Sequence, residues 1–337
     1  MSLAQIIPKI KKILLSNFPT IGFLSLDPVA LEINSDSVRV MKFDRQKDKL
    51  VPKFFDEIVF KNQIDIENLT DPVKSAEITA TLKKLKNKFN FQYATVALPE
   101  DKTYLYQVTF PRAAMMDLGS AIKFSLEENV PIPATDVNFN YHVLRQNEAI
   151  VDVIVSVFPK KIICDYTELL ESAGIKIFSF LPESVSVFRS VIKKGDKGLY
   201  LLIRFLKDRA NITIVKDGAV QYTSSVMIDL DKIIKEDQFD NDEFKKLSHE
   251  LNKTMIYWFT SKKDSNQNLK IEKAVLVGQD ASNIKLIEAL ESSLKIDVEA
   301  ANVWTNCFST EDYIPKLKKN EALKYAVSIG LSIETFN

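Results

Sequence analysis

Apolar runs separated by short polar breaks dominate the start of the chain. Residues 31–43, LEINSDSVRVMKF, contain an apolar run, a polar break and a second apolar run, which is typical of a β-hairpin with a tight turn. Further strands are predicted at 21–26, 53–60 and 93–99. Between the last two strands, apolar residues recur at helical spacing, at Ile78, Leu82 and Leu85. This spacing predicts a helix over 71–89.

A second block of strands and helices follows before the chain returns to the first pattern. Strands are predicted at 105–111, 137–145 and 149–159, and an amphipathic helix at 113–130. A helix over 160–174 is closed by Gly174, the residue type favoured just past a helix C-terminus. The strand 175–182 ends this part of the chain.

The second half repeats the opening pattern. The turn KDG at 216–218 is a strong hairpin signal between two alternating runs. Strands are predicted at 198–206, 210–216, 219–228, 273–278 and 296–302, and helices at 243–263, 281–294 and 320–334. The order of three strands, helix, strand, helix and strand therefore occurs twice, with an extra block inserted in the first half. Two similar α/β domains that face each other would place a cleft between their hairpins, and such a cleft is a favoured ligand site.

Composition narrows the function classes. Lys and Arg together number 45, as do Asp and Glu, so no global positive field would recruit nucleic acid. The two cysteines, Cys164 and Cys307, lie far apart, as do the two histidines, so no metal-ligand spacing is visible. Only 8 of 337 residues are glycine, against an average usage of about 7 %. Because loops that cradle phosphates need glycine, this count argues against nucleotide hydrolysis.

The N-terminal stretch AQIIPKIKKILLSNF, residues 4–18, differs from the rest. Its apolar residues share one helical face, and Lys9, Lys11 and Lys12 lie away from that face. A basic amphipathic helix can lie on a membrane surface or bind a partner, and the alternative is a flexible or core-docked end. No apolar run approaches the ~20 residues of a membrane-spanning helix.

Several stretches resemble the PilM family, which comprises cytoplasmic actin-like proteins of type IV pilus assembly related to the cell-division protein FtsA. The most specific is AIKFSLEENVPIPATDVNFNYHVL, residues 121–144, which is similar to the family's inserted segment. The other stretches are 32–40, 149–189, 210–226 and 274–304. The resemblance implies a duplicated actin-like, ribonuclease H-like α/β fold with a small α+β subdomain inserted in the first half. The implied units are 1–20 (basic segment), 21–103 (start of the first domain), 104–160 (insert), 161–195 (completion and crossover) and 196–337 (second domain).

The chain departs from the family at each phosphate loop. Where the family has Asp-Ile-Gly, the first loop reads Glu32-Ile33-Asn34 and the second reads Arg204-Phe205-Leu206, and the third signature keeps only Gly278. A leucine cannot bring a bare backbone amide to a phosphate as glycine does. The residues of this degenerate nucleotide site are Glu32, Asn34, Ser35, Asp36, Ser37, Arg204, Leu206, Lys207, Gly278, Gln279 and Asp280. Ser35, Asp36 and Ser37 would either contact a phosphate or form an ordinary turn. We therefore expect no catalytic residue, no required cofactor and no metal site, with ATP and magnesium bound weakly if at all.

The resemblance also implies a docking function. The predicted protein is a scaffold on the inner face of the cell membrane that takes up the N-terminal tail of a bitopic PilN-like partner and contacts the pilus motor ATPases. The expected groove residues are Phe124, Glu127, Glu128, Val130, Pro131 and Tyr141, with the two glutamates suited to a basic tail. Two alternatives stay open: an ATP-binding conformational switch of the same machinery, and an FtsA-like filament protein that self-associates.

Overall fold

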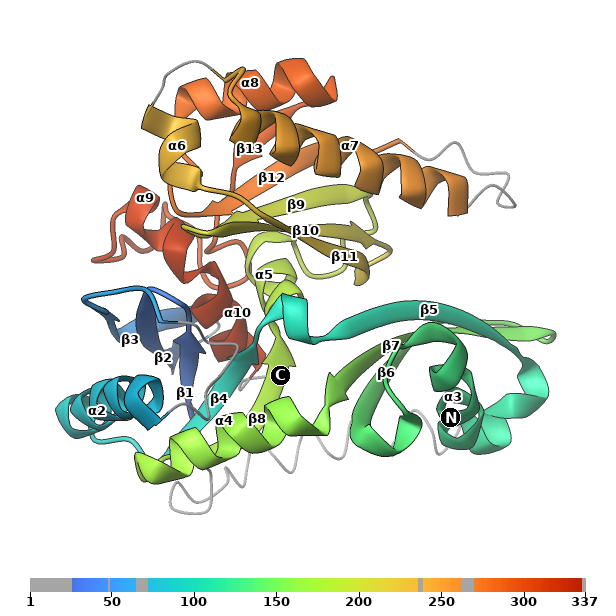
Figure 1. The fold of residues 1–337 in the computed structure, drawn as a ribbon, viewed down its shortest axis with the longest axis horizontal. Coiled ribbons are helices and arrows are strands. Elements are labelled where there is room, and N and C mark those ends of the chain that lie inside the picture. The colour runs from blue at the N-terminus through green and yellow to red at the C-terminus, as the bar shows by residue number, and fades with distance from the viewer. Residues whose placement is uncertain (1–25, 48, 65–71, 236–238, 262–269, 335–337) are drawn as a thin grey trace.

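The computed structural model describes residues 26–334 except 48, 65–71, 236–238 and 262–269 (Figure 1). The predicted basic segment 1–20, with Lys9, Lys11 and Lys12, lies outside these residues. Among the described residues, no helix combines the length and the apolar character needed to cross a membrane.

The first domain is a mixed sheet with helices on both of its faces. Its strands lie in the order β3-β2-β1-β4-β8, with antiparallel pairing from β3 to β1 and parallel pairing from β1 to β8. Their bounds are Val29–Ile33 (β1), Ser37–Gln46 (β2), Lys49–Val59 (β3), Tyr93–Leu98 (β4) and Lys176–Pro182 (β8). Helices α2 (Pro72–Phe89) and α4 (Lys160–Ser172) pack on one face, where the predicted helical stripe of Ile78, Leu82 and Leu85 is fully buried. Gly174 follows α4 with a φ of 71°, as its place after the helix predicts.

The second domain repeats this topology. Its strands lie in the order β11-β10-β9-β12-β13, with antiparallel and parallel pairs in the same places as in the first sheet. The strand bounds are Tyr200–Phe205 (β9), Arg209–Lys216 (β10), Ala219–Met227 (β11), Lys273–Gly278 (β12) and Val298–Ala300 (β13). The helices of its outer side are α6 (Leu230–Lys235), α7 (Asp242–Ser261) and α8 (Ile284–Leu294). The matching strand orders confirm the duplicated actin-like fold that the sequence predicts.

The inserted subdomain is a small sheet with a helix on one face. Its strand order is β5-β7-β6, with bounds Tyr104–Pro111, Ile150–Pro159 and Val137–Gln146. Helix α3 (Leu118–Asn129) follows a 3₁₀ turn at Arg112–Asp117, and further 3₁₀ turns lie at Glu100–Lys102 and Ala134–Asp136. Side chains alternate along a strand, so Val153 and Val155 of β7 meet Ile122 and Leu126 of α3, while the residues between them face the other way. The subdomain therefore has an inner core face and a second face that is turned away from α3.

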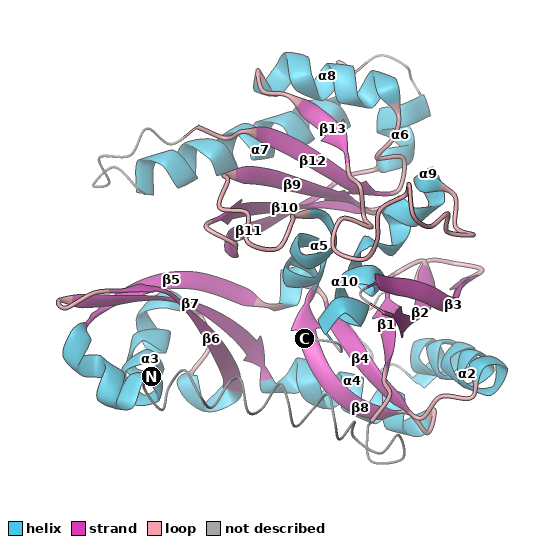
Figure 2. Ribbon diagram, turned by 180° about the vertical axis from the view of Figure 1, so that it is seen from behind, coloured by secondary structure: helices cyan, strands magenta, loops and turns pink. Residues whose placement is uncertain are grey.

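Two helices, α5 (Glu183–Val191) and α10 (Ala326–Glu334), lie between the domains (Figures 1 and 2). Helix α10 follows the short α9 (Lys319–Ala322) and a 3₁₀ turn at Leu323–Tyr325. The two helices cross closely because Gly330 has no side chain: a Cβ placed there would lie 1.8 Å from the backbone oxygen of Ser186. A continuous apolar cluster runs from Met41 in the first domain to Leu276 in the second. The two domains are thus joined by packed core and not only by a hinge.

Candidate functional site

The two hairpins in which the resemblance places degenerate phosphate loops face each other between the domains. Each is a tight turn: the Asn34 amide donates to the Ser37 carbonyl at 2.8 Å, and the Leu206 amide donates to the Arg209 carbonyl at 2.9 Å. Side chains of the turns also meet, because Ser35 Oγ donates to Asp208 Oδ2 at 3.2 Å. The hairpins therefore contact one another directly across the domain boundary.

Arg204 is the centre of the polar contacts at this boundary. Its Nη2 donates to Glu32 Oε1 and to Asn34 Oδ1, the latter at 3.1 Å, and its Nη1 lies 2.6 Å from Glu183 Oε2. Asn34 Nδ2 also donates to Glu32 Oε1 at 3.0 Å. Asn34, at a position where the resemblance implies glycine, thus has its side chain hydrogen-bonded to the buried pair of Glu32 and Arg204.

A second arginine, Arg39, also contacts Glu32. Arg39 on β2 contacts Glu32 Oε1 at 3.3 Å and donates from Nε to Glu57 at 2.8 Å, and Ser328 of α10 donates to Glu32 Oε2 at 3.2 Å. Burial would lower the pKa of the Arg39 guanidinium, but the Glu32 and Glu57 carboxylates outweigh it and the pKa is raised. Glu32 has no exposed surface, and these polar partners take the place of the water that burial removes. We call Glu32, Arg39, Glu57, Glu183 and Arg204 the interdomain ion-pair network.

Little space remains beside this network. The hollow between the hairpins and Gly278 has a volume of about 10 Å³ and is lined by Asp36, Arg39, Arg204, Phe205, Leu206, Lys207, Gly278, Gln279 and Lys324. That volume is close to the minimum for one water molecule, whereas ligand pockets measure roughly 300–1,000 Å³. In this conformation, side chains occupy the place where the resemblance puts the phosphates.

The remaining residues predicted for the degenerate nucleotide site differ in burial and in backbone conformation. Gly278 has a φ of 95°, and a Cβ there would lie 2.1 Å from the Phe205 carbonyl oxygen, which accepts a hydrogen bond from the Gln279 amide at 3.0 Å. This glycine is therefore needed for the close approach of β12 to β9. Asp36, Leu206 and Gln279 are half-buried, Ser37 is buried, and Lys207 and Asp280 are exposed. Within the described ranges, no group of His, Cys, Asp and Glu side chains is arranged to hold a metal ion.

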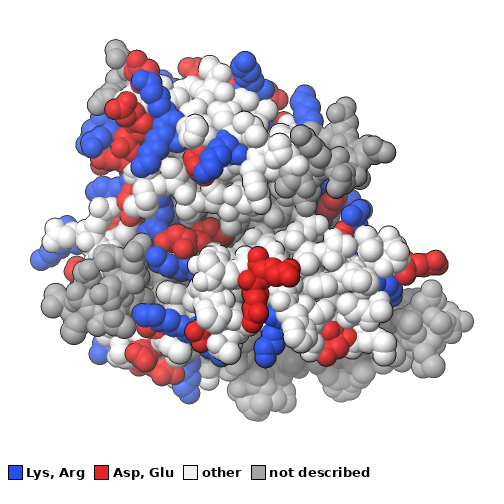
Figure 3. Space-filling model, turned by 45° about the vertical axis from the view of Figure 1, so that its right-hand side comes forward, with Lys and Arg blue, Asp and Glu red and all other residues white. Residues whose placement is uncertain are grey.

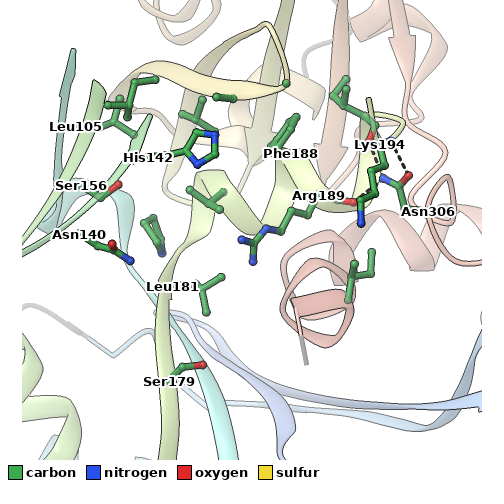
Figure 4. A pocket seen from close by; sticks show the side chains of 18 of the residues that line it. Leu105, Asn140, His142, Ser156, Ser179, Leu181, Phe188, Arg189, Lys194 and Asn306 are labelled. Atoms are coloured by element: carbon green, nitrogen blue, oxygen red, sulfur yellow. Dashed lines mark hydrogen bonds between the residues drawn. The ribbon is translucent and has the colours of Figure 1, made fainter. Parts of the chain in front are cut away.

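A much larger cavity, of about 830 Å³, lies where the inserted subdomain meets both domains (Figure 4). The outer face of the inserted sheet supplies Asn140, His142, Ile154 and Ser156, and α5 supplies Phe188 and Arg189. The remaining lining comes from β8 (Ser179, Phe180, Leu181, Pro182), from Arg45, Lys47, Leu50, Leu105, Tyr141, Phe158, Val185, Ile192, Lys194, Gly195, Asn306 and Ile333, and from the second-domain turn Gly218, Ala219 and Val220. This cavity therefore touches every part of the fold, and we call it the three-way cavity.

The structure does not bring the predicted groove residues together there. Tyr141 lines the three-way cavity, but Phe124, Glu127 and Glu128 are exposed on α3, which covers the opposite face of the inserted sheet. Val130 is buried in the subdomain core, and Pro131 is exposed just beyond α3. Five of the six predicted groove residues therefore do not line this cavity, because a helix that packs on one face of a sheet cannot line a cavity on the other, and the peptide groove at these residues stays a prediction.

The sequence reasoning also missed much of the interdomain network. Helix α5, which carries Glu183, was not among the predicted elements, although Val185, Phe188 and Val191 recur at helical spacing after Pro182. Arg39 and Glu57 are neighbours across the β2–β3 ladder, so an opposite-charge pair on adjacent strands was the available signal. No sequence pattern indicates that Ser328 belongs to the network, because its partner Glu32 is 296 positions away.

The repeated sheets, the interdomain helices and the inserted subdomain define an actin-like protein. Over 92 % of its length the chain is similar to 99 % of a chain in the structure of the PilM–PilN type IV pilus biogenesis complex, with 14 % sequence identity and a TM-score of 0.74. Lower similarity links it to the cytoplasmic domain of EpsL of the Vibrio cholerae type II secretion system (12 % identity, 88 % and 93 % covered, TM-score 0.46). A Bacteroides thetaiotaomicron protein with an actin-like ATPase fold is also similar (12 % identity, 86 % and 100 % covered, TM-score 0.44). No family model matches the sequence, and no curated protein matches it. The PilM-like fold expected from the sequence is confirmed at the level of structure.

Proposed function

We propose that this chain is a docking protein and not an ATPase, and that the three-way cavity receives an extended peptide tail of a membrane-anchored partner. One observation carries the proposal. A large cavity lies between two edge strands, while ion pairs fill the interdomain position where the resemblance puts the phosphates.

The edge strands suit a peptide ligand. β8 is the last strand of the first-domain sheet and β6 is the last strand of the inserted sheet, and both contribute to the cavity lining. The outer edge of such a strand can pair with the backbone of another chain, and recognition by strand addition gains affinity from these main-chain hydrogen bonds. An extended tail could thus form main-chain hydrogen bonds with β8 on one side of the cavity and with β6 on the other.

Apolar side chains also line the cavity. Ile154 and Phe158 of β7 face it, because the alternate residues of this strand are buried against α3. Leu181, Val185 and Phe188 add apolar surface from β8 and α5. Pockets for alternate side chains give specificity to a bound strand, so a tail with leucine or isoleucine at every second position would fit.

The similar solved structure is a complex of PilM with PilN. By analogy, we propose that the partner is a bitopic, PilN-like inner-membrane protein and that the machinery is that of type IV pilus assembly. Contact with motor ATPases, self-association and a position on the inner face of the membrane belong to the same proposal. The ATP-switch alternative would require the pair of Glu32 and Arg204 to open before a nucleotide could enter.

A binding measurement with matched variants tests the docking site. The probe is a fluorescent peptide that copies the N-terminal tail of a PilN-like protein encoded beside this chain. Ser156→Trp fills the cavity and should abolish binding, whereas Phe124→Trp, on the exposed side of α3, should leave it unchanged. Glu127→Lys/Glu128→Lys should also leave binding unchanged, because both residues lie on the far face of the inserted sheet.

Two results would overturn the proposal. Equal binding of the peptide to the Ser156→Trp and wild-type proteins would move the site away from the cavity. No binding by the folded wild-type chain would remove the docking function. A thermal melt of each variant shows whether a loss of binding reflects a loss of fold.

A further inference from the structure

The connection between β13 and α9 projects from the side of the molecule beside α9 (Figures 1 and 2). We call its last part, residues 313–319 with the sequence YIPKLKK, the basic tip. Ile314 is 87 % exposed although it is a large apolar residue. Lys316, Lys318 and Lys319 are exposed as well, and none of the three has an ion-pair or hydrogen-bond partner for its ammonium group in the described part of the chain. The basic tip thus presents an apolar side chain and three lysines to its surroundings.

Packing on both sides of Ile314 fixes the basic tip in this position. Before Ile314, the ring of Tyr313 meets the ring of Phe308 edge-on with centroids 4.8 Å apart, and the Tyr313 amide donates to the Ser309 carbonyl at 3.1 Å. After it, Leu317 is buried in the apolar cluster that joins the domains. A single exposed apolar residue is common on protein surfaces. Here, however, the fold holds that residue outward between two anchored neighbours and beside unpaired lysines.

The charge of the basic tip is of one sign. Residues 313–320 contain three lysines and neither Asp nor Glu. The nearest carboxylates along the chain are Glu311, Asp312 and Glu321, and Asp312 is paired with Lys49 at 3.1 Å. On the face of the molecule in Figure 3, in contrast, side chains of both signs lie side by side, and much of the lower half is uncharged. The basic tip therefore suits an anionic partner.

This combination of groups fits a lipid bilayer better than a protein. A stable protein interface covers about 800 Å² on each partner around a packed apolar centre, and one projecting side chain between lysines presents no such area. A bilayer has no fixed shape, so an apolar side chain can enter it at the level of the headgroups while the ammonium groups meet anionic headgroups. The methylene chains of the lysines can lie along the apolar region at the same time.

The basic tip is also close to the three-way cavity along the chain. Asn306, eight positions before Ile314, lines that cavity, and the amide of Leu50, another lining residue, donates to the Cys307 carbonyl at 3.1 Å. Eight residues span at most about 28 Å. A membrane-anchored partner with its tail in the cavity would therefore hold the basic tip near the membrane, and such tethering makes a weak surface contact effective.

We propose that the basic tip contacts an anionic lipid surface, with Ile314 inserted among the headgroups and the three lysines against their negative charge. The inference rests on the proposed position of this chain at a membrane and names the surface that makes the contact. Each lysine near an anionic surface strengthens binding about fivefold, so three together contribute about a hundredfold. Because this is weak binding by itself, the basic tip orients a chain that its partner already holds at the membrane.

Tryptophan fluorescence of the full-length chain tests the contact. Ile314→Trp adds an exposed indole, whereas Trp258 and Trp304 are 3 % and 4 % exposed, so a change in emission on addition of lipid reports the basic tip. With vesicles of equal parts phosphatidylcholine and phosphatidylserine, the emission should shift to shorter wavelength, and brominated lipid should quench it. With phosphatidylcholine alone, neither change should occur. Added salt should reverse the shift, because it screens the attraction between lysine and headgroup.

Two matched pairs of lysines separate the basic tip from the net charge of the chain. Cosedimentation with the same phosphatidylserine vesicles measures the partition coefficient of each variant. Lys318→Gln/Lys319→Gln should lower this coefficient roughly 25-fold. Lys83→Gln/Lys84→Gln removes the same charge from two adjacent, exposed lysines of α2 and should leave it nearly unchanged, because charges more than ~8 Å from the lipid are screened at physiological salt.

Two results would overturn the proposal. An emission spectrum that phosphatidylserine vesicles do not change would show that the basic tip does not enter lipid, even where the chain binds vesicles through its N-terminal basic segment, and would leave a protein as its partner. Equal partition of the two lysine variants would remove the role of the basic tip. Neither result bears on the docking function, which the fluorescent peptide and Ser156→Trp test in the absence of lipid.

Discussion

Arg204 of β9 donates to Glu32 of β1, so an ion pair joins the two domains at the point where the family resemblance places a nucleotide's phosphates. The resemblance implies aspartate at the position of Arg204 and glycine at the position of Asn34. Here an arginine supplies positive charge to Glu32 and an asparagine fills the space of a glycine. Arg204 therefore supplies one cation to two buried carboxylates, Glu32 and Glu183.

Removal of Arg204 tests how much the pair contributes to stability. Arg204→Met keeps much of the side-chain volume but leaves Glu32 buried with Arg39 as its remaining cation. A broken buried pair is strongly destabilising, so we expect the free energy of unfolding to fall by about 3 kcal/mol. Urea denaturation measures this change. Lys207→Met, in the exposed turn of the same hairpin, should change it by less than about 0.5 kcal/mol. Equal stability of the two variants would mean that the pair is energetically neutral.

The small volume of the interdomain hollow predicts that nucleotide does not raise the melting temperature. Because the hollow beside Arg204 holds about 10 Å³, ATP with magnesium has no room without separation of the domains. We expect the melting temperature to be the same with and without millimolar Mg·ATP. A ligand at a hundred times its Kd would add about 2.7 kcal/mol of stability, so binding would be evident. A shift that saturates with ATP concentration would contradict this prediction and favour the conformational switch.

Glu100 predicts a specific dependence of stability on pH. This residue is buried, accepts a hydrogen bond from the Ser184 amide at 2.9 Å, and has a pKa that burial raises above the ordinary 4.5. A raised folded-state pKa means that the native protein retains this proton at a pH where the unfolded chain has lost it. The contribution to stability is therefore largest below pH 4.5 and declines as pH rises through the folded-state pKa.

Replacement of the carboxyl by an amide isolates that contribution. Glu100→Gln should raise the melting temperature near neutral pH, and the two proteins should converge below pH 4.5. Calorimetry across this pH range measures both effects. Glu288→Gln, at an exposed position of α8, should match the wild-type protein throughout. A Glu100→Gln protein that is less stable than wild type near neutral pH would show that the ionised carboxylate is favoured in the fold.

Two glycines in helices allow the energetic cost of a steric overlap to be measured apart from the effect of helix propensity. Gly330→Ala would place a Cβ 1.8 Å from the Ser186 carbonyl oxygen and force α10 away from α5. We expect the free energy of unfolding to fall by about 3 kcal/mol, which is the upper end of the usual cost of overpacking a core. Gly119→Ala in α3 meets only Asp117 Oδ1 at 3.9 Å and should be neutral or gain up to about 1 kcal/mol from helix propensity. Chemical denaturation measures the free energy of unfolding of both variants. If Gly330→Ala is tolerated as well as Gly119→Ala, α10 and α5 cross loosely enough to accept a methyl group.

The sequence by itself determined the repeated order of strands and helices, because the apolar period of each element is a local property. Its resemblance to a known family also predicts three altered phosphate loops, which include Asn34 and Arg204. Only the tertiary structure decided what these residues do: Arg204 meets Glu32 across 172 positions, and no local pattern records such a contact. The same limit applies to the groove. The period of α3 shows that Phe124 and Glu128 are exposed, but which face of the inserted sheet the helix covers depends on packing between distant elements.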